Sequence, residues 1–179
     1  MNWRVLSREI AGKLDCNPAL TNERPIICID SLHQRMDRFD IKDEHNRSYP
    51  ISTAAMGMGN QADSFKTPFG IHRIRQKIGG GQPRGMIFEA REPIGRVARD
   101  LDFREKDEIT SRILWLDGLE LGFNNGAGCD TYSRYIYIHG TSDEKRIGQP
   151  VSAGCIRMRN DDVIELFDEV LVDDLVLIR

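Results

Sequence analysis

Short apolar runs separated by polar turns recur along most of the chain. Runs of strand length, rich in β-branched and aromatic residues, lie at residues 25–30, 49–54, 71–74, 86–89, 109–116, 135–138 and 175–178. Such runs are typical of β-strands. The charged and poorly periodic residues 97–106 are interpreted as a loop. This pattern predicts a mainly β domain with a few short helices.

One stretch near the start has helical periodicity instead. Leu6, Ile10 and Leu14 lie four residues apart, with Trp3 on the same side. This spacing predicts a short amphipathic helix over residues 3–14. We expect the helix to cover an edge or a face of the main fold, and binding of a partner is the alternative role.

A second helix is predicted after Asn160, whose side chain can cap it. Asp161 and Asp162 stand in its first turn, where the helix dipole favours negative charge. Its apolar face is formed by Val163, Ile164, Phe167, Val170 and Leu171. Asp173 and Asp174 then separate the helix from the last strand, and all these carboxylates are interpreted as solvated groups.

Length and charge limit the class of protein. The chain has 179 residues and a net charge of −3, so it suits one domain with a core that needs neither disulfides nor a metal. A protein that binds nucleic acid would usually be basic, so we predict no nucleic-acid partner. No apolar run approaches the roughly 20 residues of a transmembrane helix, and no membrane segment is predicted.

The cysteines are interpreted as reduced thiols. Cys16, Cys28, Cys129 and Cys155 form no C-x-x-C pair, so the sequence predicts no zinc site. An even number would permit two disulfides, but the irregular spacing does not resemble a disulfide scaffold. No other metal and no organic cofactor is predicted.

The start of the chain bears on its location. Arg8 and Glu9 fall where a secretory signal would have its apolar core. We therefore expect a cytoplasmic protein, in agreement with reduced thiols. The alternative is a chain whose signal was removed, which would place the protein in the periplasm or cell envelope.

One histidine and one cysteine stand out as candidate catalytic groups. The predicted strand 135–138 runs into His139 and Gly140, and twelve residues separate His139 from Ser152. The intervening loop is polar and rich in turn formers, so it can fold back and bring Cys155 to the rim of the sheet that holds His139.

The chemistry of such a pair is nucleophilic. The reactive form of cysteine is the thiolate, and a neighbouring imidazole can take its proton while Arg157 and Arg159 favour the anion. Gly154 lets a substrate approach the backbone, whose N–H groups could bind an oxyanion. The alternative is that Cys155 is a small buried hydrophobic residue and His139 a surface residue.

These segments resemble the L,D-transpeptidase family, also called the YkuD-like catalytic domain. The family signature is a strand ending in His-Gly, a spacer, and then Ser-His-Gly-Cys followed by an apolar residue and Arg or Asn. This chain has His139-Gly140 and, after the spacer, Ser152-Ala153-Gly154-Cys155-Ile156-Arg157; residues 66–74 resemble the family's Thr-Pro-x-Gly-x-His strand entry. Ala153 departs from the pattern, which raises a question about substrate handling.

The resemblance implies a fold and a division of the chain. It covers residues 24–179, interpreted as the catalytic domain, with residues 1–23 as a helix and loop that pack on it. The fold implied is a YkuD-like β-sandwich with an N-terminal helix and a helix after the catalytic cysteine. It also adds a strand over residues 34–39, followed by a polar turn at 42–46.

The resemblance also implies acyl transfer on peptidoglycan stem tetrapeptides, in which Cys155 attacks the L,D-peptide bond and terminal D-alanine leaves, protonated by His139. A cytoplasmic enzyme would meet soluble muropeptides and hydrolyse them, so an L,D-carboxypeptidase of murein recycling is the favoured interpretation. An L,D-transpeptidase that forms cell-wall cross-links is the alternative. A non-catalytic peptidoglycan-binding module and a thiol redox sensor are further alternatives.

Further residues are candidates for the site. Ser152 would steady the turn or the imidazole, and Arg157 would pair with a substrate carboxylate or form a structural salt bridge. By the resemblance, His72 contacts substrate or shapes the cleft, with a hydrogen-bonded structural histidine as the alternative. Tyr137 lines the cleft or packs the sheet, and Gly140 is placed with the substrate-binding residues. The family further implies that carbapenem-type β-lactams acylate Cys155.

Overall fold

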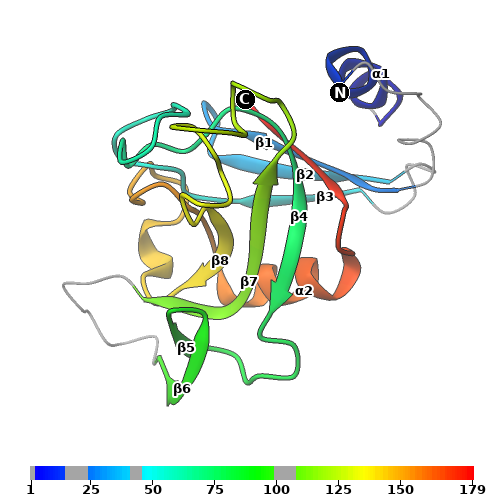
Figure 1. The fold of residues 1–179 in the computed structure, drawn as a ribbon. Coiled ribbons are helices and arrows are strands. Elements are labelled where there is room, and N and C mark those ends of the chain that lie inside the picture. Colours follow the sequence, from blue (N-terminus) through cyan, green and yellow to red (C-terminus); the bar gives the residue numbers. More distant parts are fainter. Residues whose placement is uncertain (1–2, 15–23, 41–45, 99–107) are drawn as a thin grey trace.

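The computed structural model describes residues 3–14, 24–40, 46–98 and 108–179 (Figure 1). Two α-helices, ten strands and one short 3-10 helix are found in these ranges. The helices are α1 (Trp3–Leu14) and α2 (Asn160–Glu169), with the 3-10 helix at Glu144–Arg146. The strands are β1 (Ile26–Asp30), β2 (Arg35–Phe39), β3 (Arg47–Pro50), β4 (Gly70–Ile78), β5 (Met86–Glu89), β6 (Glu92–Val97), β7 (Ile109–Gly118), β8 (Tyr137–Thr141), β9 (Ile156–Met158) and β10 (Leu175–Ile178).

The strands form one curled sheet. Their order is β3-β2-β1-β10-β4-β7-β5-β6; outside this order, β8 pairs with β7, and β9 pairs with β8. Most neighbours are antiparallel, but β1 pairs with β10 in parallel and β8 pairs with β9 in parallel. The prediction of a mainly β domain with short helices, one of them after Cys155, is confirmed.

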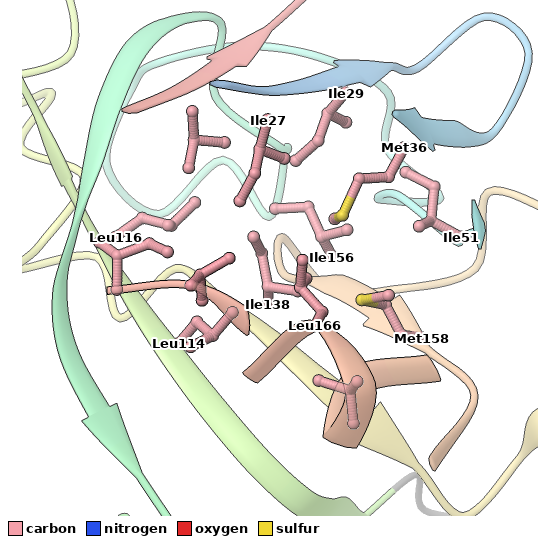
Figure 2. Close-up of a cluster of buried hydrophobic side chains, with 14 of the residues drawn as sticks. Ile27, Ile29, Met36, Ile51, Leu114, Leu116, Ile138, Ile156, Met158 and Leu166 are labelled. Carbon is pink, nitrogen blue, oxygen red and sulfur yellow. The ribbon is translucent and has the colours of Figure 1, made fainter. Parts of the chain in front are cut away.

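The main core lies inside the curl of the sheet. Figure 2 shows apolar side chains from both halves of the sheet and from α2 meeting there; those labelled include Ile27, Ile29, Met36, Leu114, Ile138, Ile156 and Leu166. Full burial of one such side chain contributes about 1.5–3 kcal/mol before entropy is counted. α2 packs against β7 and β8, so it supports the strand that carries His139.

The helix α1 covers a second, smaller cluster. Leu6 and Ile10 are wholly buried and pack with Trp3 against apolar residues of β1, β4 and β10. Figure 1 shows α1 beside the end of the sheet that holds β1, away from β8 and α2. The predicted amphipathic helix is therefore present, and it has the covering role that was expected.

Several local predictions need correction. Residues 92–97 form β6, although no strand was predicted there. The predicted strand 49–54 is shorter, because β3 ends at Pro50 and the chain continues through isolated bridges at Ser52 and Ala54. Most of the expected turn at 42–46 and of the expected loop at 97–106 lies outside the described residues.

The second helix also begins differently from the prediction. Arg159 is its N-cap residue and makes no side-chain cap bond, while Asn160 is the first helical residue. Asp174 is 1% exposed and accepts a hydrogen bond from the backbone N–H of Leu171. Burial raises the pKa of the Asp174 carboxyl, so this group is not the solvated one that was expected.

Candidate active site

Two adjacent strands bring the candidate base and nucleophile to one face of the sheet. In the parallel pair β8–β9, Ile138 lies opposite Ile156 and His139 opposite Arg157. Ile138 and Ile156 point into the main core, so the alternation along each strand directs His139 to the other face. Cys155 directly precedes β9 and packs on the apolar cluster of that other face, together with Tyr137. Cys155 and His139 are therefore diagonal neighbours.

The imidazole of His139 is held in a defined orientation. Its Nδ1 lies 2.7 Å from the carbonyl oxygen of Gly140. A carbonyl oxygen can only accept, so Nδ1 carries the hydrogen and Nε2 is the nitrogen that can take a proton. The residue is 3% exposed, which contradicts the alternative of a surface histidine.

The sulfur of Cys155 lies against the backbone of the strand that leads to His139. The N–H of Tyr137 donates to Sγ over 3.4 Å, and Sγ lies 3.4 Å from the carbonyl oxygen of Tyr135, to which a thiol can donate. The first contact favours a thiolate and the second a thiol. Cys155 is partly exposed, so it is not the fully buried hydrophobic residue of the alternative interpretation.

Ser152 and Gly154 shape the turn that carries the sulfur. The Ser152 hydroxyl donates to the carbonyl oxygen of Cys155 over 2.5 Å and accepts from the N–H of Gly154 over 3.2 Å. Ser152 thus steadies the turn, one of the two roles expected for it. The bond from Gly154 to Ser152 occupies the Gly154 N–H, which was a candidate oxyanion donor. Gly154 has a φ of +130°, and a Cβ there would lie 3.2 Å from the side chain of Ile136.

Thr67 lies in the strand-entry motif but was not among the predicted site residues. The structure places its hydroxyl between two segments: it accepts from the N–H of Ala54 over 3.0 Å and donates to the carbonyl oxygen of Gly154 over 2.9 Å. Thr67 is wholly buried. These bonds fix the nucleophile turn to the segment that follows β3.

Arg134 is a second residue without a sequence signal. Its guanidinium donates to the carbonyl oxygens of Gly59, Asn60 and Lys66, and so ties the 59–66 loop together beside the nucleophile turn. Burial lowers the pKa of Arg134, while the negative charges of the Cys129 and Cys155 thiolates raise it. The same attraction stabilises the thiolate of Cys155.

A buried polar network behind His139 holds the start of α2. The side-chain oxygen of Asn160 accepts from the hydroxyls of Thr110 and Ser111 over 2.7 and 2.5 Å. Its NH2 group donates to the carbonyl oxygen of Thr141 over 3.0 Å and to Glu144 over 2.6 Å. The Glu144 carboxylate also accepts from the Asn160 backbone N–H, where the helix dipole favours a negative charge.

The predicted substrate-binding residues are mostly inside the protein. His72 is 0% exposed, with Nδ1 3.1 Å from the carbonyl oxygen of Gly70 and Nε2 3.1 Å from the Thr131 hydroxyl. Burial lowers the pKa of His72 to about 4. In this structure a substrate has no exposed part of the ring to touch, so the hydrogen-bonded structural histidine is the interpretation that fits.

Gly140, Arg157 and Tyr137 are also buried. A Cβ on Gly140 would lie 2.6 Å from the carbonyl oxygen of Thr110, so this glycine permits close strand packing and its own carbonyl orients His139. Arg157 is 8% exposed, which leaves little of it for a substrate carboxylate. Tyr137 packs the sheet, and its hydroxyl accepts from Arg91 over 3.3 Å.

Metal ligands, thiols and membrane-spanning helices were each considered in the sequence, and the described ranges show how the relevant residues lie. Within them, no group of three or more His, Cys, Asp or Glu side chains could hold a metal ion. The three cysteines in those ranges, Cys28, Cys129 and Cys155, are unbridged; Cys16 lies outside them. Neither α1 nor α2 has the length and hydrophobicity needed to span a bilayer.

A comparison with family models identifies the domain. The model of the YkuD L,D-transpeptidase catalytic domain matches residues 24–178, which is most of the chain. The chain belongs to the L,D-transpeptidase family. Both segments with the His139 and Cys155 motifs lie within the match.

Relatives from this family match over shorter stretches. A putative L,D-transpeptidase of Bacillus subtilis, YqjB, is 50% identical over 48 residues, which cover 27% of each chain. A probable L,D-transpeptidase of Escherichia coli, ErfK/SrfK, is 53% identical over 45 residues, or 25% of this chain and 14% of the relative. The matched stretches therefore span only a small part of the curated relatives.

Solved structures of the family share the fold. An L,D-transpeptidase of Xylanimonas cellulosilytica superposes with a TM-score of 0.53 at 17% identity, covering 88% of this chain and 61% of that chain. L,D-transpeptidase 3 of Mycobacterium tuberculosis, solved with a faropenem-derived adduct, gives 0.53 at 13% identity, covering 87% and 60%. The chain spans about three fifths of these neighbours, and at such identities the likeness shows the fold alone.

Proposed function

We propose that the protein is a cysteine-dependent L,D-carboxypeptidase, which hydrolyses the L,D-peptide bond of peptidoglycan tetrapeptide stems and releases D-alanine. The observation that carries the proposal is the placement of Cys155 and His139 on one face of adjacent strands, with the Nδ1–H of His139 anchored to Gly140. That anchor directs Nε2 to proton transfer, which is the role a base needs to activate a thiol.

The chemistry runs in two halves. Nε2 of His139 takes the proton of the Cys155 thiol, the sulfur attacks the scissile carbonyl carbon, and the C–N bond breaks. The proton on Nε2 passes to the amine of the departing D-alanine, and a thioester remains on Cys155. Water then attacks the thioester and gives a proton to Nε2. The S–C bond breaks, that proton returns to sulfur, and the tripeptide leaves.

The acceptor in the second half separates the two candidate reactions. An amine from a second stem would give a cross-link and make the protein an L,D-transpeptidase, which is the alternative function. We propose hydrolysis of soluble muropeptides in the cytoplasm, as in murein recycling. The unbridged state of Cys28, Cys129 and Cys155 supports this location, because reducing compartments keep thiols free.

The family also supports a proposal about inhibitors. One neighbour was solved with imipenem and another with a faropenem-derived adduct. We infer that carbapenem-type β-lactams acylate Cys155 here, because an opened lactam ring would leave the same kind of thioester as the substrate.

Product analysis tests the function. Purified protein is incubated with a disaccharide tetrapeptide, with and without an amine acceptor, and the products are weighed by mass spectrometry. Tripeptide in both reactions is expected, whereas a cross-linked dimer would favour the transpeptidase. Cys155→Ala is expected to abolish the product, and Cys129→Ala, which removes another partly exposed thiol, should retain it.

A carbapenem adduct distinguishes the non-catalytic alternative. Intact mass measurement after incubation should show one adduct, mapped to Cys155 and absent from Cys155→Ala. Turnover of tetrapeptide by Cys155→Ala at the normal rate would refute the proposed mechanism, and a protein that neither turns over tetrapeptide nor gains an adduct would be a binding module.

A further inference from the structure

The tight turn between β5 and β6 holds an arginine in an unusual backbone conformation. Glu89 pairs with Glu92 across the hairpin, so Ala90 and Arg91 are its two turn residues. Their φ angles are 47° and 72°, in the left-handed region where Asn-Gly or Gly-Gly is the usual choice. A side chain at both positions costs stability, and such conformations persist mainly where the surrounding structure and function require them.

The turn directs the Arg91 side chain onto aromatic residues. The guanidinium carbon lies 5.0 Å from the ring centre of Trp115 and 5.1 Å from that of Tyr135. The guanidinium also donates to the Tyr137 hydroxyl over 3.3 Å, and this bond raises the pKa of Arg91. Arg91 therefore stays cationic in a fixed position.

Arg91 has no acidic partner among the described residues, unlike three other arginines of the sheet and its loops. Arg73 and Arg75 share Asp117, and Arg84 pairs with Asp161. Among the residues that the structure describes, no carboxylate lies within salt-bridge distance of Arg91, and its contacts are the aromatic groups above. Its fork of N–H donors is thus held in place without being neutralised.

The aromatic residues that hold Arg91 also hold the nucleophile. The sulfur of Cys155 contacts the backbone of Tyr135 and of Tyr137, and the side chains of these two residues contact the guanidinium. Cys155 itself packs on the cluster that contains Trp115 and Tyr137. The positive charge and the sulfur of Cys155 are therefore linked through the same two tyrosines, with the guanidinium at their side chains and the sulfur at their backbone.

We propose that Arg91 is a specificity-determining residue that binds a carboxylate of the donor peptide beside the scissile bond. This inference rests on the proposed function. A planar guanidinium suits a carboxylate because it can donate two parallel hydrogen bonds. The carboxylate belongs either to the terminal residue that leaves or to the side chain of the preceding diamino acid. Binding of a substrate carboxylate was one of two roles expected for Arg157, which is buried, and this proposal gives that role to Arg91.

Alkylation of Cys155 measures this charge without any turnover. Iodoacetate and iodoacetamide react with the same sulfur but differ in a carboxylate, so the ratio of their rate constants reports anion binding beside it. The rates are followed by mass spectrometry of the Cys155 peptide in a Cys129→Ala background. Arg91→Gln should lower the iodoacetate-to-iodoacetamide ratio about two- to fivefold, the range of an exposed charge pair, and the difference should shrink in high salt.

Two variants control the alkylation measurement. Arg96→Gln removes the same charge from the same hairpin, at a side chain paired with Glu108, and should leave the ratio unchanged. Arg91→Lys keeps the charge without the planar fork and should give an intermediate ratio. An unchanged ratio in Arg91→Gln, or an equal fall in Arg96→Gln, would overturn the proposal.

Peptide substrates then identify the carboxylate. Tetrapeptides amidated either at the terminal carboxylate or at the diamino-acid carboxylate are compared with the free acid. In the wild type, amidation of the recognised group should raise KM more than it lowers kcat, and Arg91→Gln should remove that difference. Equal sensitivity of wild type and Arg91→Gln to both amidations would refute substrate recognition by Arg91. If no peptide is turned over, the proposed function fails, while the alkylation ratio still tests the charge.

Discussion

The hydroxyl of Thr67 illustrates how much a single buried atom contributes to the site. It accepts from one segment and donates to the carbonyl of Gly154, next to the nucleophile. Removing a buried hydrogen-bonding partner leaves the remaining donor or acceptor unsatisfied, which costs more than the bond itself contributes. The position of Cys155 therefore depends on a residue that takes no part in the proposed chemistry.

Thr67→Val is expected to lower the free energy of unfolding by about 1–3 kcal/mol, because the buried N–H of Ala54 loses its acceptor. The reaction of Cys155 should slow as well, since the turn is no longer fixed. Urea unfolding and alkylation by iodoacetamide measure these effects. Thr67→Ser keeps the hydroxyl and is the control; equal stability of the valine and serine variants would show that the two bonds do not matter.

His72 shows a different residue-scale effect, which depends on pH. Burial lowers its pKa to about 4 from the ordinary histidine value of 6.5, so the unfolded chain binds the proton more tightly than the folded one. The stability associated with neutral His72 is complete above pH 6.5 and is lost as the pH falls towards 4. The pKa of Asp174 is raised by burial, so ionisation of this carboxyl lowers the stability of the protein as the pH rises.

We expect wild-type protein to lose about 3 kcal/mol of stability through His72 between pH 6.5 and 4. Urea unfolding across this range should therefore be less pH-dependent in His72→Gln than in the wild type. His33→Gln, at an exposed position where the ring pairs with Asp30, should change this dependence much less than His72→Gln. A His72 ring that titrates near 6.5 by NMR would contradict the prediction.

At the scale of the element, α2 is attached to the sheet by its first residue. Asn160 joins the hydroxyls of Thr110 and Ser111 to the carbonyl oxygen of Thr141 and to Glu144. Thr110 also lies opposite Gly140 in the β7–β8 pair. The network therefore sets both the start of the helix and the backbone that orients His139.

Replacing Asn160 by Asp should destabilise the protein by about 2–3 kcal/mol. The acceptor of the Thr110 and Ser111 hydroxyls is kept, but a buried carboxylate then faces the Glu144 carboxylate instead of donating to it. Thermal unfolding at several pH values measures the effect, which should lessen in acid as a carboxylate takes up a proton. Asp161→Asn, on the exposed side of the same turn, should change stability by less than about 1 kcal/mol.

At the scale of the molecule, α1 and the active-site strands lie in different regions. The helix covers the cluster formed with β1, β4 and β10, while Cys155 packs on residues of β5, β7 and β8. This separation agrees with a catalytic domain over residues 24–179 on which residues 1–23 only pack. That division remains a prediction, and mutation of α1 can test it.

Leu6→Ala should cost about 2–4 kcal/mol because it opens a cavity under a wholly buried side chain. The kcat of the folded protein should stay the same, since the change is remote from Cys155. Val5→Ala, at a neighbouring position that is 52% exposed, should have little effect on either quantity. A large fall in kcat for Leu6→Ala, measured where the variant is fully folded, would show that α1 contributes to the site.

Local patterns in the sequence predicted most elements and the candidate pair. Strand-length apolar runs and the spacing of Leu6, Ile10 and Leu14 depend only on near neighbours, and so they could be interpreted without the fold. β6 was missed because its residues, Glu92–Val97, are mostly exposed and include proline and glycine, so no apolar alternation marks them. The start of α2 was misplaced by one residue because Glu144, distant in the sequence, takes over the capping role.

The sequence by itself determined a mainly β protein, the covering helix, the His139 and Cys155 motifs and the family they resemble. Tertiary structure alone decided which side chains surround the sulfur. It buried His72, Gly140 and Arg157 and brought Thr67, Arg134 and Arg91 close to the nucleophile turn or to the tyrosines that hold it. The physical reason is that burial and long-range contacts are set by strand order and register, whereas composition and periodicity report only on a residue's neighbours in the chain.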